Sequence, residues 1–344
     1  MTSKERVERA LDFLPVDKPA LCCDISAAGY YEHGEKLRDL MRPLGSDFGP
    51  VYEGDYDLPK PEDFDGDGRY STIKTDSFGV TWKYLIYGVT GHPIAWPLDD
   101  WSKLDVYKFP EQSKLCGQAL IEKRAKTEQL QNQGYFVRGG WVTYFERSYA
   151  VRKFEDVLMD IGTGDKDFLR FTSRLHEYNC LAVENLLLEG YDAIQFADDL
   201  GTQDGPIISP EHFRTIYAPL YKELVSMVKK AGKRAFFHTC GYAMPFLYDI
   251  AEMGFDQIWP QLNCHDLIPF VKRCRDLRLA VSIHPERSEL MTFGKPDEIK
   301  DRMYAYHEAF KPWEGGSYYY LEIDNGFPYE NIVAMVEAVR ELRG

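Results

Sequence analysis

The chain has 344 residues, and its 41 basic and 55 acidic side chains give it a formal net charge of −14 at pH 7. Such an acidic surplus disfavours binding to nucleic acid or to an anionic membrane surface. The content of 44% hydrophobic and 14% aromatic residues is typical of a folded globular protein rather than a disordered chain. The opening segment MTSKERVERALDF is charged, and no run of 18 apolar residues occurs, so we expect a cytoplasmic protein without a membrane span.

The cysteines give a further indication of compartment. Their number is odd, and in a reducing compartment they are expected to be free thiols or metal ligands rather than disulfide partners. They are Cys22, Cys23, Cys116, Cys180, Cys240, Cys264 and Cys274.

The first third of the chain has a mixed pattern. Apolar residues at helical spacing predict a helix over 3–13, and a short apolar run predicts a buried strand over 18–25. Residues 47–110 then hold short aromatic-rich runs separated by Gly, Pro and Asp, a pattern that favours hairpins over helices. We interpret this segment as an insertion within the domain, serving as a lid or as a contact in a homodimer.

The rest of the chain alternates strands and helices. The pattern predicts strands over 135–139, 192–197, 234–239, 255–260, 279–284 and 318–323. The helices between and after them are predicted over 113–133, 154–161, 166–189, 209–231, 245–253, 266–275, 297–310 and 328–342. This alternation indicates parallel βαβ units, and no Gly-rich GxGxxG turn follows an early strand. We therefore predict one (β/α)8 TIM barrel over residues 1–344 rather than a doubly wound sheet.

The predicted helix over 209–231 shows clear local signals. Ser209 can accept hydrogen bonds from the first free amides, Pro210 suits the first helical position, and Gly232 suits the left-handed stop. Pro219 inside the helix predicts a kink or a break into two helices.

Polar residues gather at the ends of the predicted strands, where the reactive groups of such barrels lie. These ends are Asp198-Asp199, His238-Thr239-Cys240, His284 and Glu322. His238 and Cys240 are two residues apart, so on a strand they point to one face and are candidates for zinc ligands. The plainer alternatives are a packed cysteine beside a hydrogen-bonded histidine, and aspartates that cap the following turn.

The segment KRAFFHTCGYAMPFLYDIAEMGFDQIWP, residues 233–260, resembles the uroporphyrinogen decarboxylase superfamily, whose pattern is a strand followed by HxCG and a Pro-containing helix. Further matching segments are TSKERVERALDFLPVDKPA, DSFGVTWKYLIYGVTGHPIAWPLDDWSKLDVYKFP, ISPEHFRTIYAPLYKEL and PYENIVAMVEAVRE. The resemblance extends over nearly the whole chain and implies a (β/α)8 barrel.

The superfamily contains tetrapyrrole decarboxylases and zinc-dependent methyltransferases that work with corrinoids. The decarboxylases carry an arginine-containing loop after the first strand, whereas residues 26–31 read SAAGYY here, without arginine. A polycarboxylate substrate is thus disfavoured. The resemblance is closer to the methylcobalamin:coenzyme M methyltransferase-like and aryl methyl ether O-demethylase-like members, which use HxC and a distant cysteine. That distant position is Leu321 here, next to Glu322.

The resemblance implies a corrinoid-dependent methyltransferase that takes a methyl group from a methoxylated aromatic compound, a small-molecule donor. Zinc would be held by His238, Cys240 and Glu322, with Asp199, Cys264, His284 or no metal at all as the alternatives. A separate corrinoid protein is the expected partner, because no cobalamin-binding DxHxxG stretch occurs.

Further roles follow from the same resemblance. Asp198 or Asp199 would bind the substrate or protonate its leaving oxygen, a contribution of about 10²–10⁴ in rate. The candidate substrate contacts are Tyr30, Tyr31, Glu146 and His284. Two other functions stay open, a metal-free lyase acting on a carboxylic acid and a non-catalytic barrel that binds a corrinoid or a tetrapyrrole.

Overall fold

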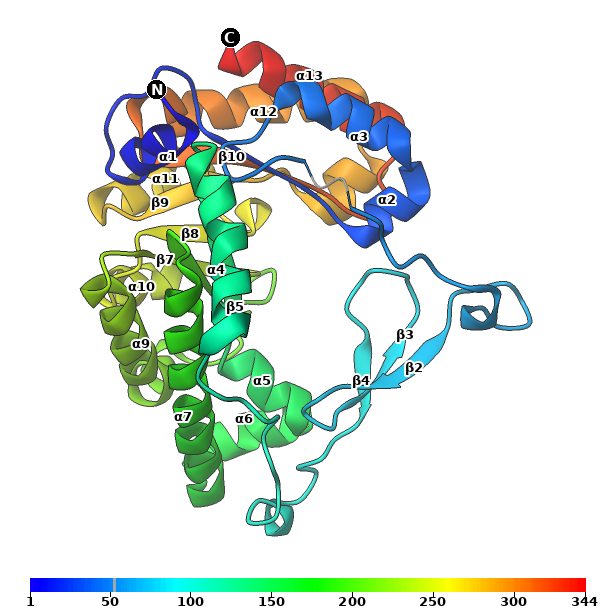
Figure 1. The fold of residues 1–344 in the computed structure, drawn as a ribbon, viewed down its shortest axis with the longest axis vertical. Coiled ribbons are helices and arrows are strands. Elements are labelled where there is room, and N and C mark those ends of the chain that lie inside the picture. Colours follow the sequence, from blue (N-terminus) through cyan, green and yellow to red (C-terminus); the bar gives the residue numbers. More distant parts are fainter. Residues whose placement is uncertain (52–53) are drawn as a thin grey trace.

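A computed structural model describes residues 1–51 and 54–344. Its main feature is a curled sheet of seven parallel strands in the order β1-β10-β9-β8-β7-β6-β5 (Figure 1). The predicted α/β fold with a barrel-type parallel sheet is confirmed. The strands are β1 (Leu21–Ile25), β5 (Arg138–Val142), β6 (Ala193–Ala197), β7 (Arg234–Thr239), β8 (Gln257–Pro260), β9 (Ala280–Ile283) and β10 (Ser317–Ile323).

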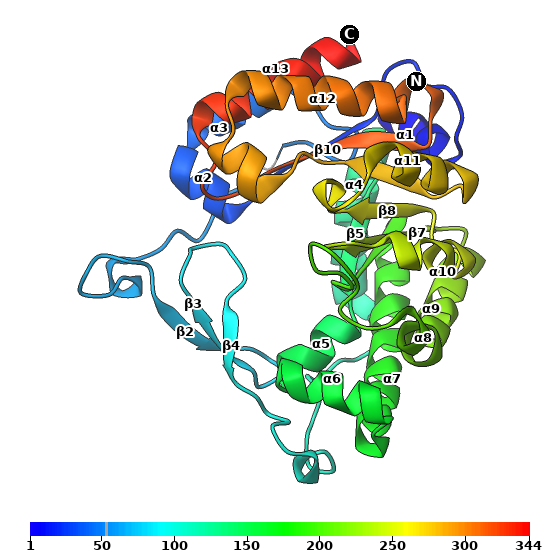
Figure 2. The same ribbon diagram turned by 180° about the vertical axis from the view of Figure 1, so that it is seen from behind.

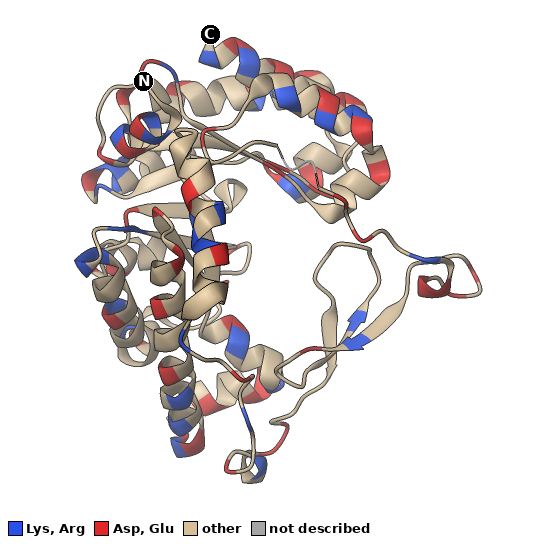
Figure 3. Cartoon of the chain, viewed as in Figure 1, with Lys and Arg blue, Asp and Glu red and all other residues tan. Residues whose placement is uncertain are grey.

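Helices cover the outside of this sheet, as the two opposite views show (Figures 1 and 2). Basic and acidic residues are interspersed along them (Figure 3). No helix in the described part of the chain is both long enough and apolar enough to cross a bilayer. The helices are α1 (Ser3–Leu11), α2 (Ala27–His33), α3 (Glu35–Met41), α4 (Gly117–Asn132), α5 (Phe145–Val151), α6 (Phe154–Thr163), α7 (Lys166–Glu189), α8 (Pro210–His212), α9 (Ala218–Lys230), α10 (Leu247–Glu252), α11 (Leu267–Asp276), α12 (Pro296–Phe310) and α13 (Tyr329–Arg343).

Among the described residues the ring has seven strands, one fewer than the predicted (β/α)8 barrel, and the difference lies between β1 and β5. There a single residue bridges the edges: the amide of Asp47 donates to the carbonyl of Leu21 at 2.7 Å, and the amide of Phe136 donates to the carbonyl of Asp47 at 3.0 Å. The buried Asp47 carboxylate also accepts from Arg6 at 2.6 Å and from Arg343 at 3.1 Å. An aspartate clamped by two guanidinium groups thus occupies the place of an eighth strand among the described residues.

The segment over 47–110 contains a second, antiparallel sheet of three strands, β2 (Thr72–Thr75), β3 (Thr81–Tyr84) and β4 (His92–Ala95). Asp76 organises the turn between the first two, because its carboxylate accepts from the amides of Phe78 and Val80 and from the indole of Trp82. This matches the expected hairpin structure. The role of the segment as a lid or dimer contact stays a prediction.

At Pro219, where a kink or a break into two helices is predicted, the structure shows an interruption of regular α-helical geometry. The segment splits into α8, a π-helical turn over Phe213–Tyr217, and α9, in which Pro219 lies in the first turn. A π-turn at this place fits the missing amide of proline, which cannot continue regular helical bonding. The Ser209 hydroxyl accepts from the amide of His212 at 3.1 Å, and Gly232 has a φ of +69° after the helix. Both capping predictions are therefore confirmed.

The seven cysteines are all free thiols. This agrees with the expectation from their odd number.

Candidate functional site

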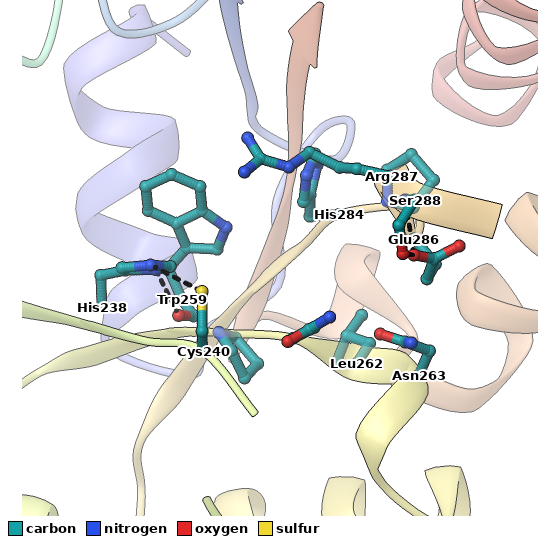
Figure 4. Close-up of a pocket in the computed structure, with 12 residues that line it drawn as sticks. His238, Cys240, Trp259, Leu262, Asn263, His284, Glu286, Arg287 and Ser288 are labelled. Carbon is teal, nitrogen blue, oxygen red and sulfur yellow. Dashed lines mark hydrogen bonds between the residues drawn. The ribbon is translucent and has the colours of Figure 1, made fainter. Parts of the chain in front are cut away.

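His238 is the penultimate residue of strand β7, and its ring is buried beside Cys240 (Figure 4). Its Nδ1 lies 3.0 Å from the carbonyl of Trp259 on β8, and its Nε2 lies 3.5 Å from the Cys240 Sγ. A carbonyl can only accept, so Nδ1 carries the proton and Nε2 keeps its lone pair. Burial lowers the pKa of His238 to about 4 and so favours the neutral ring. This is the form of histidine that binds a metal ion.

Two glycines explain how the loops after β6 and β7 come together. Gly241 has a φ of +72°, and a Cβ on it would lie 2.0 Å from the carbonyl oxygen of Gly201. A Cβ on Gly201 would lie 2.4 Å from the amide nitrogen of Tyr242. Only glycine at both positions permits this approach. It brings Asp199 beside Cys240, whose amide donates to Asp199 Oδ1 at 2.9 Å.

Asp199, His238 and Cys240 form a group that could hold a metal ion, with ligand atoms all within 4.8 Å of one another. Asp199 Oδ1 lies 3.7 Å from His238 Nε2. Zinc bonds of about 2.0–2.3 Å give tetrahedral edges of about 3.3–3.8 Å, so the Nε2–Sγ and Nε2–Oδ1 spacings suit zinc. Burial, with the charge of Asp199, raises the pKa of the Cys240 thiol. A bound cation would supply the positive charge that stabilises the thiolate.

Asp198 has a different environment from its neighbour. It is fully buried, and its carboxylate accepts from the amides of Tyr144, Phe145 and Glu146 and from the hydroxyl of Tyr221, the last at 2.6 Å. Burial raises the pKa of Asp198 to about 6, while these hydrogen bonds act in the opposite direction. With its oxygens occupied by four donors at the start of α5, Asp198 is an anchor for that helix rather than a group facing a ligand.

Glu146 stands in the first turn of α5, so Asp198 positions it. Burial and the charges of Asp198 and Asp199 raise the pKa of Glu146 to about 8. Its side chain lines a cavity of about 570 Å³ between α5 and the three-stranded sheet, shared with Trp82 and Trp141 among others. The insertion therefore contributes to the surroundings of this predicted substrate contact.

A cavity of about 160 Å³ lies against His238 and Cys240 (Figure 4). His284, which follows β9, also lines it: Nδ1 lies 3.2 Å from the carbonyl of Tyr320, while the buried Nε2 has no hydrogen-bond partner among the described residues. Burial lowers the pKa of His284 to about 3, so the ring is neutral and Nε2 is a free acceptor. The structure thus brings this predicted substrate contact to the candidate metal ligands.

Trp259 borders this cavity and a second one of about 350 Å³ at the mouth of the barrel. The second cavity is also lined by Arg138, Trp141, Gln195, Tyr320 and Glu322. The sequence reasoning did not single out Trp259, Arg138 or Trp141. The lone arginine in the apolar run YFVRGGW was an available signal, whereas the pairing of Trp259 with His238 is seen only in the register of β7 and β8.

Glu322 is not brought to His238 and Cys240. Its Oε2 accepts from Arg287 Nη1 at 2.6 Å, and the same guanidinium nitrogen lies 3.3 Å from Asp324. The group of side chains around His238 that could hold a metal ion does not include it. Arg287 holds the Glu322 carboxylate, and the carboxylate that lies beside His238 and Cys240 is that of Asp199.

Tyr30 and Tyr31 lie on α2 and are not among the residues that line these three cavities. The Tyr30 hydroxyl donates to Glu35 at 2.7 Å, and the ring of Tyr31 packs edge-on against Tyr87 at 5.3 Å. Cys264, one of the alternative ligands, contacts Gln203 with its Sγ at 3.1 Å. The structure gives these three residues no contact with His238 or Cys240.

Comparisons with known proteins place the chain in a family. The family model described as uroporphyrinogen decarboxylase (URO-D) matches residues 140–342, and the search of curated proteins gives no match. Among solved structures, a methyltransferase from Methanosarcina mazei superposes with a TM-score of 0.64 at 17% identity, covering 100% of both chains, which supports the barrel fold. A dihydropteroate synthase from Xanthomonas albilineans reaches a TM-score of only 0.35 at 13% identity, covering 57% of this chain and 64% of that one. The family match extends over more than half of the sequence, and the chain therefore belongs to the uroporphyrinogen decarboxylase (URO-D) family.

Proposed function

We propose that the protein is a zinc-assisted methyltransferase that moves a methyl group from a methoxylated aromatic compound to a corrinoid on a separate protein. The observation that carries this proposal is the group formed by Asp199, His238 and Cys240 at the carboxyl edge of the parallel sheet. The URO-D family match and the barrel shared with the Methanosarcina mazei methyltransferase support the methyltransferase assignment.

The three side chains supply oxygen, nitrogen and sulfur to a metal ion. His238 would bind through Nε2, since Nδ1 is committed to the carbonyl of Trp259. Three protein ligands leave the fourth tetrahedral position to the substrate, as in catalytic zinc sites. When bound, zinc would act as a Lewis acid that polarises the oxygen bearing the methyl group. The carboxylate in this set makes it harder than a set with two thiolates, which favours an ether oxygen over a thiolate.

The surroundings of the three ligands suit an aromatic substrate. Trp259 stands between the two cavities, and Trp141 packs against it with ring centroids 6.2 Å apart. His284 Nε2 is an acceptor that no described residue bonds to, so it can take a hydrogen bond from a phenolic hydroxyl on the aromatic ring of the substrate. Glu146 is the candidate contact on the side of the insertion. Asp198 fixes the position of Glu146 and takes no direct part.

The first test is metal analysis of protein purified without chelator. We expect His238→Ala to lose about one equivalent of zinc relative to the wild-type protein, because it removes a direct ligand. The matched control is His212→Ala, at a histidine on α8 outside the ligand group, which should leave the zinc content unchanged. Equal zinc content in wild-type protein and His238→Ala would refute the metal assignment.

The second test measures methyl transfer from a panel of methoxylated aromatic compounds to reduced cobalamin. The readout is the absorbance of the methylcobalamin that forms. We expect transfer that is lost in Cys240→Ser. The assay is repeated with any corrinoid protein that a neighbouring gene encodes. Absence of transfer from every donor would refute the methyltransferase assignment, and release of CO2 from a carboxylic acid would establish the lyase alternative instead.

A further inference from the structure

A second group of side chains that could hold a metal ion lies on the outer helices α7 and α9. His176 and Cys180 are four residues apart on α7 and so share one face of that helix, and Glu223 comes from α9, which packs against α7. His176 Nε2 lies 3.1 Å from Glu223 Oε2 and 3.6 Å from Cys180 Sγ. All three ligand atoms lie within 4.8 Å of one another.

These spacings agree with the edges of a zinc coordination tetrahedron. With bonds of about 2.0–2.1 Å to nitrogen and oxygen and about 2.3 Å to sulfur, the nitrogen–oxygen edge is about 3.3 Å and the nitrogen–sulfur edge about 3.6 Å. Two of the three edges therefore already match, and the third, between Cys180 Sγ and the Glu223 carboxylate, is at most 4.8 Å long. The donor set of imidazole, thiolate and carboxylate also suits zinc.

A buried tyrosine holds the histidine in the required orientation. The hydroxyl of Tyr144, a residue that is 0% exposed, lies 2.6 Å from His176 Nδ1 and leaves Nε2 directed at Cys180 and Glu223. A hydrogen bond to the other ring nitrogen is the usual support of a metal-binding histidine. Nδ1 would donate to the tyrosine oxygen in the metal-bound form. The Glu223 side chain is 65% exposed, so an ion and a water ligand can reach the site from solvent.

We propose that His176, Cys180 and Glu223 form a second zinc site, which ties α7 to α9. The site shares no ligand with the Asp199–His238–Cys240 group, so it stands independently of the proposed function.

The two helices joined by this site also support the strand-end region. Tyr144 packs edge-on against Tyr221 of α9 with ring centroids 4.8 Å apart, and both residues donate to Asp198. Zinc on the outer helices would therefore stiffen the contacts around Asp198 without touching a substrate. This makes its role one of positioning.

The test is a titration of the full chain with Co²⁺, whose thiolate charge-transfer band reports a cysteine ligand. It is performed in the background Asp199→Asn/His238→Ala/Cys240→Ser, which lacks the other ligand set. We expect about one equivalent of Co²⁺ with a thiolate band. Adding Cys180→Ser should abolish that band. Adding Glu223→Gln, a change at an exposed side chain that should not impair folding, should weaken affinity about tenfold or more.

The matched control is Cys116→Ser, which removes an exposed cysteine outside both groups and should leave the band unchanged. The absence of a thiolate band in the background variant, or a band that persists after Cys180→Ser, would overturn the proposal. Should the background variant fail to fold, Cys180→Ser is made in the otherwise wild-type chain. It is then expected to lose one bound Co²⁺, whereas His238→Ala loses the other, and an unchanged Co²⁺ content in Cys180→Ser would refute the second site.

Discussion

Asp198 and Asp199 are adjacent in sequence, yet the structure predicts opposite consequences for the same substitution. Asp198→Asn replaces one carboxylate oxygen with an amide NH2, which cannot accept a hydrogen bond. In the wild-type protein the amide of Glu146 lies 2.8 Å from Oδ1 and the amide of Phe145 lies 2.9 Å from Oδ2. In the variant the NH2 group faces one of these two amides in either orientation of the side chain. Either way a buried backbone N–H loses its acceptor, whereas the Tyr221 hydroxyl can rotate to accept.

The magnitude follows from the number of lost acceptors. One buried donor without a partner costs about 1–3 kcal/mol, and the remaining hydrogen bonds to Asp198 lose their charge assistance. We therefore expect Asp198→Asn to lower the free energy of unfolding by about 2–4 kcal/mol. Asp199→Asn keeps an oxygen that can accept from the amide of Cys240, and its side chain is 36% exposed. That variant should stay within about 1 kcal/mol of wild type.

The assay is equilibrium unfolding in urea at pH 7, followed by circular dichroism, together with zinc affinity measured by competition with a chromophoric chelator. Asp198→Asn should unfold at lower urea than wild type, whereas Asp199→Asn should unfold near the wild-type midpoint and bind zinc at the strand ends about tenfold or more weakly. Equal unfolding midpoints for the two variants would show that Asp198 does not anchor α5. Unchanged zinc affinity in Asp199→Asn would remove Asp199 from the ligand set.

Three further predictions concern the same region. Gly241→Ala should weaken zinc binding at the strand ends, measured by the same competition, because its Cβ would lie 2.0 Å from the Gly201 carbonyl oxygen; unchanged affinity would contradict this. Burial lowers the pKa of His265 to about 4, so as pH falls from 6.5 to 4 this side chain is protonated in the unfolded chain before it is in the folded one. The free energy of unfolding therefore declines by about 3 kcal/mol over that window. In His265→Phe, the free energy of unfolding measured in urea should fall less between pH 7 and pH 4.5 than it does in wild type. An equal fall in the two proteins would contradict the assignment. Glu322→Gln should leave the zinc content unchanged by metal analysis, since Arg287 holds that carboxylate, and a loss of zinc would return Glu322 to the ligand set.

The fold could be predicted largely because its signals are local. Alternating strands and helices, the Ser209 cap and the interruption at Pro219 are written in short stretches of sequence, and the structure shows each. The bridging role of Asp47 could not be predicted, since it depends on Arg6 and Arg343, which are far away in the chain.

The candidate site could be predicted only in part for a related reason. The two-residue spacing of His238 and Cys240 fixes their common direction on one strand, and the structure places their side chains together. The partner of Glu322 comes from a different strand end, so sequence spacing did not indicate that Arg287 would hold it. Asp198 and Asp199 have the same charge and neighbouring positions, and only the burial of Asp198 under α5 distinguishes them.

The hydrogen bond between Phe136 and Asp47 also has an evolutionary consequence. The segment that holds the three-stranded sheet starts and ends at this one point of the ring, and it is also held from outside, since the amide of Leu98 donates to the carbonyl of Val151 at 3.0 Å. The entropy of closing such a segment grows only with the logarithm of its length. Related chains can therefore lengthen, shorten or exchange this segment while the ring keeps its register, and substrate preference can diverge without redesign of the barrel.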